Sequence, residues 1–487
     1  MMKRFFFLTA LMLATLTSMA QDRPKLVVGI AVDQMRWDYL YRYYDEYTDG
    51  GFKRLMNEGY NFENCMINYI PSVTAIGHTS LFTGSVPSIH GIAGNNFYIK
   101  GKSVYCCEDP DVQTVGSETK AGMRSPRNLL VTTIGDELRT ATNWQAKLFG
   151  VSYKDRAAIF PSGHSSNAAY WFDEKANGFI TSTYYMSELP EWVKEYNSGI
   201  KKLPLDDIQY TPYGNEIVVE MAKEIILNEK LGKSQTTDML TISFSCPDKV
   251  GHKFGTHDPK THDQYVGLDK QLAAFFTFLD KQIGKGQYLV FLSADHGAAN
   301  SVQLNLDHRL PTGLFRSREI LGDMNKHLTT VFGKEMKYGN AIQDYRVVIN
   351  HSGIKEAGLD ECKVREEMVN FLKEKDCFSY VVDLEKVMAA PIPAVVKEKI
   401  VNGYNRERSG EIQLIPKPGY LGSGGYGTSH GLWNPYDCHL PFLLMGWGVK
   451  HGTSQRACYI TDIAPTVCAL IHIQMPNGCI GNPLDLK

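Results

Sequence analysis

Four segments of the chain are largely apolar over seven or eight residues: 25–32, 239–245, 287–294 and 440–446. Runs of this kind predict β-strands that are covered on both faces of a sheet. Helix-like patterns lie between the runs, at residues 126–142, 213–229 and 260–281. Strands that alternate with helices predict an α/β fold, here a three-layer α/β/α sandwich around a largely parallel central sheet.

The pattern changes between residues 300 and 425. Helix-like stretches at 318–333, 362–375 and 393–402 mix with short alternating strands at 345–350 and 411–415. We interpret this part as an α+β cap inserted into the core, with the glycine-rich run 419–431 as the hinge back. The predicted plan is a signal peptide (1–20), the first part of the core (21–299), the cap (300–425) and the last part of the core (426–487).

Residues 1–20 have the pattern of a cleavable signal peptide. Lys3 and Arg4 give a positive start, an apolar run follows, and Ser18 and Ala20 are small residues at a cleavage position. We expect cleavage after Ala20 and export to the periplasm or out of the cell. The apolar run is too short to span a bilayer and no later segment is long enough, so no membrane insertion is expected.

The composition of the chain limits the kinds of binding partner that we expect. With 51 basic and 53 acidic residues, the formal net charge is −2, which gives no overall field for capturing nucleic acid. We therefore expect small-molecule substrates and no nucleic-acid partner. The chain has ten cysteines, some of which should pair in an exported protein, and the absence of a C-x-x-C motif disfavours a thiolate zinc site.

Aspartates follow three of the four predicted strands: Asp33, Asp248 and Asp295. Ligands of parallel sheets bind at the carboxyl ends of the strands. With His252, His296 and His430, these aspartates form a set of oxygen and nitrogen donors that suits zinc or a similar divalent ion. Taken singly, such an aspartate more often caps a helix, and most histidines are structural or solvated. The other histidines, including His78, are expected to be so.

Residues 68–84 crowd five hydroxyl side chains into a segment that begins as a loop and continues with a helix-like pattern. These are Ser72, Thr74, Thr79, Ser80 and Thr83. The segment holds either a nucleophile at the start of a helix or only a well-capped helix, and its own pattern does not decide between the two.

Several motifs together resemble the alkaline phosphatase superfamily. They are Asp33 after the first strand, the hydroxyl segment, D-x-x-G-H at 248–252, S-A-D-H-G at 293–297 and G-T-S-H-G at 427–431. They follow the family order and span residues 26–470. The nearest resemblance is to bacterial alkaline phosphatases with a threonine nucleophile and a Lys/Arg/Asn phosphate site, and it implies an alkaline-phosphatase-like fold.

The resemblance also implies roles for single residues. Thr74 would be the nucleophile and a metal ligand, with Ser72 as the alternative. The phosphate would be bound by Asn95, or by its neighbour Asn96, and by Lys154 and Arg156. Two zinc ions would be held by two sets of ligands, Asp248, His252 and His430 for one ion and Asp33, Asp295, His296 and Thr74 for the other.

Physical reasoning supports the same choice. A metal ion can hold a threonine hydroxyl as the alkoxide, and the start of a helix favours an anion. Lys154 and Arg156 are two residues apart after the apolar run 146–151. If that run is a strand that continues through them, both side chains leave the same face. Two cations suit the two charges of a phosphate monoester.

We therefore predict an exported, zinc-dependent alkaline phosphatase that hydrolyses phosphate monoesters through a phosphothreonine intermediate. The alternative is a phosphodiesterase or nucleotide pyrophosphatase of the same superfamily. A sulfatase is disfavoured because no C-x-P-x-R segment is present. A third reading is a non-catalytic binding protein derived from a phosphatase, which a zinc content below about two ions per chain would support.

Overall fold

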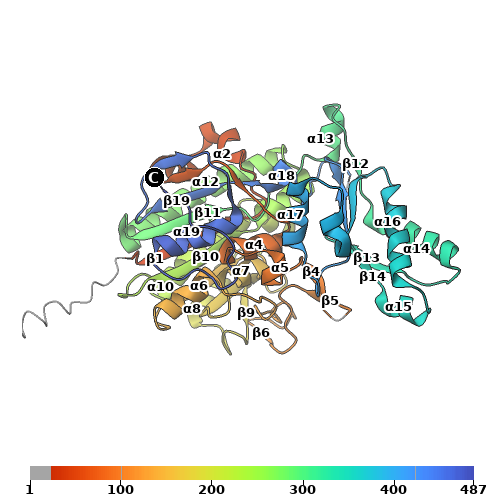
Figure 1. Ribbon diagram of the computed structural model, residues 1–487. Coiled ribbons are helices and arrows are strands. Elements are labelled where there is room, and N and C mark those ends of the chain that lie inside the picture. The colour runs from red at the N-terminus through yellow and green to blue at the C-terminus, as the bar shows by residue number, and fades with distance from the viewer. Residues whose placement is uncertain (1–22, 100, 423, 487) are drawn as a thin grey trace, which may run out of the picture.

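A ten-stranded sheet forms the centre of the molecule, in the order β20-β2-β19-β11-β1-β10-β7-β8-β9-β6 (Figure 1). The structure is a computed structural model that describes residues 23–99, 101–422 and 424–486. The expected signal peptide lies outside these residues. The strands of the sheet are β1 (Leu26–Val32), β2 (Tyr60–Phe62), β6 (Thr114–Val115), β7 (Leu148–Ser152), β8 (Ala168–Asp173), β9 (Gly178–Ser182), β10 (Asp238–Phe244), β11 (Tyr288–Ser293), β19 (Phe442–Gly446) and β20 (Gly452–Ser454).

The middle of this sheet is parallel. Neighbouring strands run in the same direction from β11 through β1, β10 and β7 to β8. The prediction of a largely parallel sheet is therefore confirmed for its centre. The predicted strand at 440–446 is β19, which pairs antiparallel with β11. Its end therefore lies at the edge opposite to the ends of β1, β10 and β11, the parallel strands that Asp33, Asp248 and Asp295 follow.

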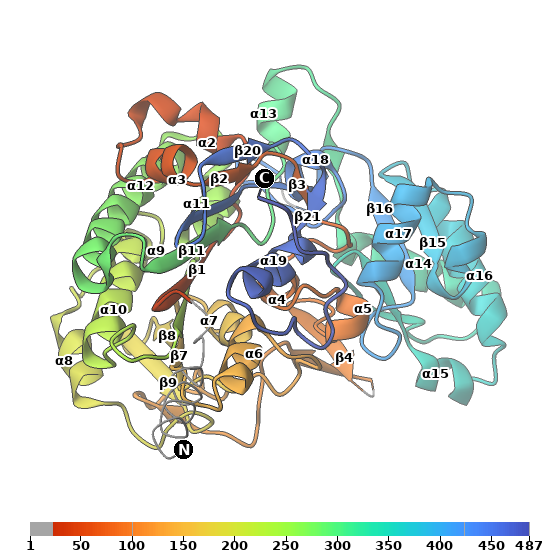
Figure 2. The ribbon, with the colours of Figure 1, turned by 60° about the vertical axis from the view of Figure 1, so that its left-hand side comes forward.

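Helices cover both faces of the sheet, as expected for a three-layer sandwich. In Figure 2, α10 and α12 lie to the left of the strands, and α4, α6 and α19 lie to their right. The helices of this core are α2 (Tyr39–Arg42), α3 (Phe52–Glu58), α4 (Thr74–Thr83), α5 (Pro87–His90), α6 (Ile134–Ala141), α7 (Asp155–Ser162), α8 (Glu191–Gly199), α9 (Leu205–Gln209), α10 (Tyr213–Asn228), α11 (Cys246–Phe254), α12 (Pro259–Leu279), α18 (Pro435–Cys438) and α19 (Ile463–Leu470).

Two of the three predicted core helices are confirmed almost to the residue, as α10 and α12. The third prediction, 126–142, is too long, because α6 begins only at Ile134. Thr133 accepts a hydrogen bond from the backbone of Asp136, whose side chain accepts one from Thr133 in return. This capping box fixes the helix start, and the residues before it form a loop.

The region between 300 and 425 has a sheet and an apolar core of its own (Figure 2). Its strands are β13 (Gly339–Gln343), β14 (Arg346–Ile349), β16 (Ile412–Pro416) and β15 (Phe378–Asp383), in this spatial order. Its helices are α13 (Val302–Asp307), α14 (Ser317–Phe332), α15 (His351–Glu356), α16 (Glu361–Lys373) and α17 (Ala394–Gly403). This agrees with an α+β cap, although the boundaries at 300 and 425 stay a prediction.

Short strands complete the structure. They are β3 (Cys65–Met66), β4 (Asn96–Ile99), β5 (Lys102–Tyr105), β12 (Gly313–Leu314), β17 (Tyr420–Leu421), β18 (His439–Leu440) and β21 (Cys458–Tyr459). The pair β12 and β17 lies at the two ends of the cap, so that the chain leaves and re-enters the core at one place. The predicted glycine-rich hinge begins at this pair.

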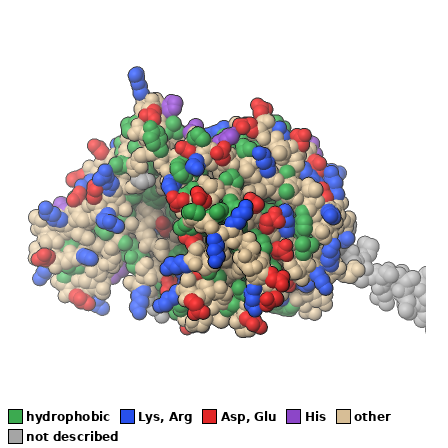
Figure 3. Space-filling view, turned by 180° about the vertical axis from the view of Figure 1, so that it is seen from behind, with side chains coloured by type: hydrophobic (Ala, Val, Ile, Leu, Met, Phe, Trp, Pro, Cys, Tyr) green, Lys and Arg blue, Asp and Glu red, His purple; other side chains and the backbone are tan. Residues whose placement is uncertain are grey.

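The expectation that cysteines pair is not met, because all ten are free thiols in this structure. Seven of them are buried among apolar side chains, where a thiol acts as a small core residue, and Cys65 lies beside Cys458 on neighbouring strands. On the surface, acidic and basic side chains are interspersed, in line with the small net charge (Figure 3). None of the helices in the described part of the chain has the length and apolar character that crossing a membrane requires.

Candidate metal centre and active site

The three predicted aspartates meet at one edge of the sheet. Asp33, Asp248 and Asp295 follow β1, β10 and β11, which are neighbours in parallel register. Asp33 continues the ladder, since its backbone N–H donates to Phe244 O at 3.0 Å. All three side chains are buried. The parallel sheet therefore brings together carboxylates that are far apart in the sequence.

Histidines join these carboxylates in two overlapping groups. Asp33, Asp295 and His296 form one group, and Asp248, His296 and His430 form the other. Within each group, one ligand atom per residue lies within 4.8 Å of the others. The rings of His296 and His430 stack with their centroids 3.5 Å apart. The first group is the set expected for one zinc ion, whereas His296 takes part in both.

His252 lies beside the second group. Its Nε2 is 3.1 Å from Asp248 Oδ1, and its ring centroid is 5.2 Å from that of His430. Its side chain is 43% exposed, whereas His296 and His430 are nearly enclosed. The structure thus brings five of the six predicted aspartate and histidine ligands into tight groups and leaves the sixth, His252, at their solvent side.

The donor set fits divalent metal ions. In each candidate histidine, Nδ1 lies within hydrogen-bond distance of a backbone carbonyl oxygen. The distances are 3.0 Å for His296, 2.8 Å for His430 and 2.9 Å for His252. A carbonyl only accepts, so Nδ1 of each ring carries a proton, and in the neutral rings of His296 and His430 Nε2 keeps its lone pair for an ion. Among the described residues, the buried atoms Asp33 Oδ1 and Asp295 Oδ2 have no hydrogen-bond partner. Buried carboxylate oxygens of this kind need a cation.

The electrostatics of the aspartates support this fit. Burial raises the pKa of Asp33 well above its ordinary value, and the charges of Asp248 and Asp295 raise it further. Burial would also raise the pKa of Asp248, but His252 and Lys154 hold it well below its usual range. Burial would raise the pKa of Asp295 too, and His296 and His78 outweigh it. Three crowded carboxylates therefore stay ionised only with positive charge beside them.

Two of the three histidines have pKa values that suit metal binding, whereas the charge of Asp248 raises the pKa of His252. Burial lowers the pKa of His430 well below its ordinary value, with further lowering by His296 and His252. Burial also lowers the pKa of His296. Both imidazoles are therefore neutral near pH 7, which is the form that binds a metal ion.

Lys154 supplies one positive charge at the centre. Its Nζ lies 2.6 Å from Asp33 Oδ2 and 2.6 Å from Asp248 Oδ2. The prediction that a strand continues through Lys154 and Arg156 is wrong, because β7 ends at Ser152 and Lys154 is the N-cap of α7. The turn into the helix, not the pleat of a strand, brings Lys154 to the carboxylates.

Arg156 lies in the first turn of α7 and is buried at its charged end. Its Nη1 donates to Tyr105 Oη at 2.9 Å, and Tyr105 in turn donates to Asp155 Oδ1 at 2.6 Å. Arg124 Nε donates to Asp155 Oδ2 at 3.0 Å. This network holds the guanidinium in place, while Arg156 Nε has no partner among the described residues.

Thr74 is the first residue of α4. Its Oγ1 lies 3.4 Å from His296 Nε2, so the hydroxyl borders both groups of ligands. Asn95 is close by, since its Oδ1 accepts a hydrogen bond from the backbone N–H of Ala75 at 3.0 Å. Asn96 is exposed. The geometry therefore favours Asn95 over Asn96 as the partner of Thr74.

The other hydroxyls of the segment are engaged elsewhere. Ser72 Oγ donates to Leu432 O at 2.9 Å. Thr79 Oγ1 donates to Ala75 O and Thr83 Oγ1 to Thr79 O within the helix. Ser80 Oγ lies 3.2 Å from His90 Nε2. Of the five hydroxyls, Thr74 is the one next to the candidate ligands.

Two residues that the sequence analysis did not select contact the ligands. Gln34 Nε2 donates to Asp248 Oδ1 at 2.7 Å, and its backbone N–H donates to Asp295 Oδ1 at 3.1 Å. His78 Nδ1 lies 3.2 Å from Asp295 Oδ2, and its Nε2 lies 2.7 Å from Ser243 Oγ. His78 is four residues after Thr74, a spacing that puts both on one helix face and could have suggested this role.

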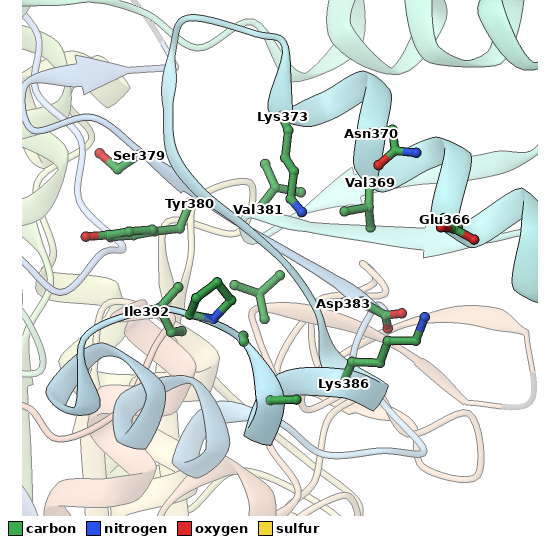
Figure 4. Close-up of a pocket in the computed structure, with 14 residues that line it drawn as sticks. Glu366, Val369, Asn370, Lys373, Ser379, Tyr380, Val381, Asp383, Lys386 and Ile392 are labelled. Carbon is green, nitrogen blue, oxygen red and sulfur yellow. The ribbon is translucent and has the colours of Figure 1, made fainter.

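The structure also has a cavity of about 500 Å³ inside the cap, between α16, β15 and the segment 386–392 (Figure 4). Lys373 and Lys386 point into it together with apolar side chains such as Val381 and Ile392. It shares no residue with the two groups of metal ligands. Its size therefore does not identify it as the catalytic site.

Comparisons with known proteins agree with this geometry. The sequence model of the family described as type I phosphodiesterase / nucleotide pyrophosphatase matches residues 27–439. Alkaline phosphatase PafA of Elizabethkingia meningoseptica is 44% identical over 97% of this chain and 96% of its own. Alkaline phosphatase PhoV of Synechococcus elongatus is 43% identical over 94% of this chain and 92% of its own.

Similarity extends to the fold. The crystal structure of wild-type PafA superimposes with a TM-score of 0.92, at 44% identity, over 96% of this chain and 99% of PafA. The chain therefore belongs to the type I phosphodiesterase / nucleotide pyrophosphatase family, within the alkaline phosphatase superfamily.

Proposed function

We propose that this protein, a phosphate monoester hydrolase by its similarity to PafA and PhoV, acts through a covalent phosphothreonine at Thr74 with two bound zinc ions. The observation that carries the proposal is the convergence of two carboxylate–histidine groups beside a hydroxyl at the start of a helix. The substrates would be small-molecule phosphate monoesters.

One ion would be held by Asp33, Asp295 and His296, with Thr74 beside it. The other would be held by Asp248 and His430, with His252 completing the set from the solvent side. When bound, zinc would supply Lewis-acid chemistry, which would lower the pKa of the Thr74 hydroxyl and offset charge on the leaving oxygen.

The protein's own groups perform the remaining work. Thr74 Oγ1 attacks phosphorus in line with the leaving alkoxide, and the positive end of the α4 dipole stabilises the charge that develops. The side chain of Asn95 and the charges of Lys154 and Arg156 hold the phosphoryl oxygens. Water then attacks phosphorus from the side that the alkoxide left and releases Thr74.

The family name raises a second candidate, a phosphodiesterase or nucleotide pyrophosphatase. A diester carries one negative charge on its phosphate, whereas a monoester carries two. The two positively charged side chains of Lys154 and Arg156 beside the candidate metal site therefore favour a monoester substrate.

The test compares Lys154→Ala and Arg156→Ala with the wild type on one aryl monoester and one aryl diester. Monoester turnover should fall by about 100-fold or more, since each variant removes a charge-assisted contact to the transferred group, and diester turnover should fall much less. Lys249→Ala is the matched control, because Lys249 pairs with Glu174 at 2.9 Å and Gln209 at 2.7 Å instead. Equal losses on both substrates would favour the phosphodiesterase.

Two further parts of the proposal need tests of their own. Fewer than about two zinc ions per purified chain would support a non-catalytic binding protein instead. Export to the periplasm or out of the cell rests on residues 1–20, and N-terminal sequencing of the mature protein should begin at Gln21.

A further inference from the structure

The hairpin that joins β13 and β14 of the cap has an unusual turn. Its two central residues, Asp344 and Tyr345, both have positive φ, 45° and 63°. Two-residue hairpins of this kind prefer Asn-Gly or Asp-Gly, because glycine adopts positive φ without strain. A tyrosine there is unfavourable by itself, so contacts outside the hairpin must hold it.

Tyr345 contacts the loop that carries His430. Its hydroxyl donates to His430 O at 2.8 Å. Its ring lies against Gly431, where an added Cβ would collide with the tyrosine ring. The backbone of a candidate metal ligand is thus held by a side chain of the cap.

Asp344 contacts the segment that carries Asn95. The neighbouring Gln343 donates through Nε2 to Asn96 O. An added Cβ at Gly94 would collide with Asp344 Oδ2, so the carboxylate lies directly against this backbone. Burial raises the pKa of Asp344 to about 6, opposed by Arg346, the backbone N–H of Asn95 and Arg156. Asp344 Oδ2 is buried without a hydrogen-bond partner among the described residues.

Arg346 contacts the loop that leads to Thr74. Its Nη2 donates to Ile70 O at 2.7 Å and to Gly403 O at 2.9 Å. Within the cap, Nε donates to Gln413 Oε1 at 2.8 Å. This buried guanidinium therefore ties the backbone four residues before the nucleophile to the sheet of the cap.

Three consecutive residues of the cap thus contact three different parts of the catalytic centre. We propose that the segment Asp344–Tyr345–Arg346 is a positioning segment of the active site, which sets the geometry of the phosphate-binding Asn95, of His430 and of the loop before Thr74. The inference rests on the proposed function and assigns the cap a role in it. This role explains the strained turn, because the side chains of Asp344 and Tyr345 must both reach the segments that carry Asn95 and His430.

The first test is Tyr345→Phe, which removes one hydroxyl and keeps the ring. The value of kcat on a phosphate monoester should fall about fivefold with KM nearly unchanged, and zinc should be lost at lower chelator concentration. Tyr338→Phe is the matched control, because buried Tyr338 donates to a carbonyl inside the cap, Lys334 O, at 2.9 Å. The kcat and the zinc retention of Tyr338→Phe should equal those of the wild type, even if its Tm is lower.

The second test concerns Asp344. Asp344→Ala should weaken binding of inorganic phosphate, measured by calorimetry, about fivefold, and Asp344→Asn should restore part of it, because an amide keeps an acceptor for Asn95. Unchanged or tighter phosphate binding in Asp344→Ala would overturn the inference, as would a Tyr345→Phe enzyme that matches Tyr338→Phe. If the wild type hydrolyses no phosphate ester, the proposed function is wrong. Zinc retention in Tyr345→Phe and phosphate binding in Asp344→Ala still test whether the segment positions the site.

Discussion

Gln34 is a single residue that contacts both groups of candidate metal ligands. It follows Asp33 directly, is buried, and has a φ of 65°. This conformation directs its backbone N–H to Asp295 and its side-chain amide to Asp248, which belong to different groups of candidate ligands. A neutral donor orients a carboxylate without adding charge to the site.

We predict that Gln34→Met weakens the binding of one of the two zinc ions about 10- to 100-fold, because Asp248 loses a donor that orients it. The other ion should bind almost normally, since the backbone contact to Asp295 remains. Competition with a chromogenic chelator measures both affinities. Gln271→Met, which removes a side-chain donor to Pro212 O, is the control and should retain both ions. Two unchanged affinities in Gln34→Met would count against the assigned role.

At the residue scale, the sequence predicts the ligands better than their surroundings. Asp33, Asp248 and Asp295 are predictable because parallel strands end at one edge of a sheet. Gln34 is not, because its role depends on a backbone conformation that no pattern of residue types encodes. The family resemblance selects Lys154, which lies beside Asp33 and Asp248, but the supporting expectation of a strand through it is wrong, since β7 ends two residues before it.

At the scale of elements, α4 depends on close packing against Asp295, which follows the strand β11. All ten of its residues are buried. Gly77, one turn after Thr74, lies so close to Asp295 that an added Cβ would collide with the backbone carbonyl. The glycine therefore determines how near α4, which begins with Thr74, comes to Asp295.

We predict that Gly77→Ala destabilises the protein by about 1–3 kcal/mol, because overpacking outweighs the better helix propensity of alanine. Gly322→Ala is the matched control on the exposed face of α14, where nothing lies within 4 Å of an added Cβ, and it should stabilise by up to about 1 kcal/mol. Urea unfolding measures both changes. A Gly77→Ala protein as stable as the control would show that α4 can shift away from Asp295.

Element prediction from sequence succeeds where a pattern is long. The helices α10 and α12 and the strands β1, β10 and β11 are confirmed because their apolar patterns extend over several turns or a whole strand. Strands of two or three residues, such as β2, β6 and β20, are too short to show a period. The start of α6 was missed because a capping box, not periodicity, determines it.

At the scale of the molecule, the cap has an apolar core of its own and contacts the catalytic core through several segments, among them the hairpin at Asp344 and Tyr345 and the helix α17. Its stability should depend on pH through His351, which begins α15 and lies 3.0 Å from both Glu361 of α16 and Glu411 before β16. The hydrogen bond to Glu411 and the one to Glu361 raise the pKa of His351 from its ordinary value of 6.5 to about 9.

Because the folded-state pKa lies above that of the unfolded chain, this stabilisation is fully present below about pH 6.5 and is lost as the pH rises through about 9. We predict that the Tm difference between about pH 6 and about pH 10 is smaller in His351→Gln than in the wild type. Differential scanning calorimetry of both proteins checks this. An equal difference in the two proteins would assign the pH dependence to other groups.

The sequence therefore predicts an inserted cap but not what it does. Its helices and strands follow from local patterns, whereas the contact of Tyr345 with His430 joins residues 85 positions apart and has no local signal. The turn itself offered none, because Asp-Tyr is not a pair that marks a tight hairpin.

The central claim is that a pair of zinc ions binds beside Thr74. Anomalous X-ray diffraction at the zinc edge, on crystals grown with zinc and inorganic phosphate, tests it most directly. We predict two peaks roughly 4 Å apart, one at Asp33, Asp295 and His296 and the other at Asp248 and His430, with Lys154 turned from the carboxylates to the phosphate. A single peak, or peaks away from these side chains with Lys154 still between Asp33 and Asp248, would contradict the account.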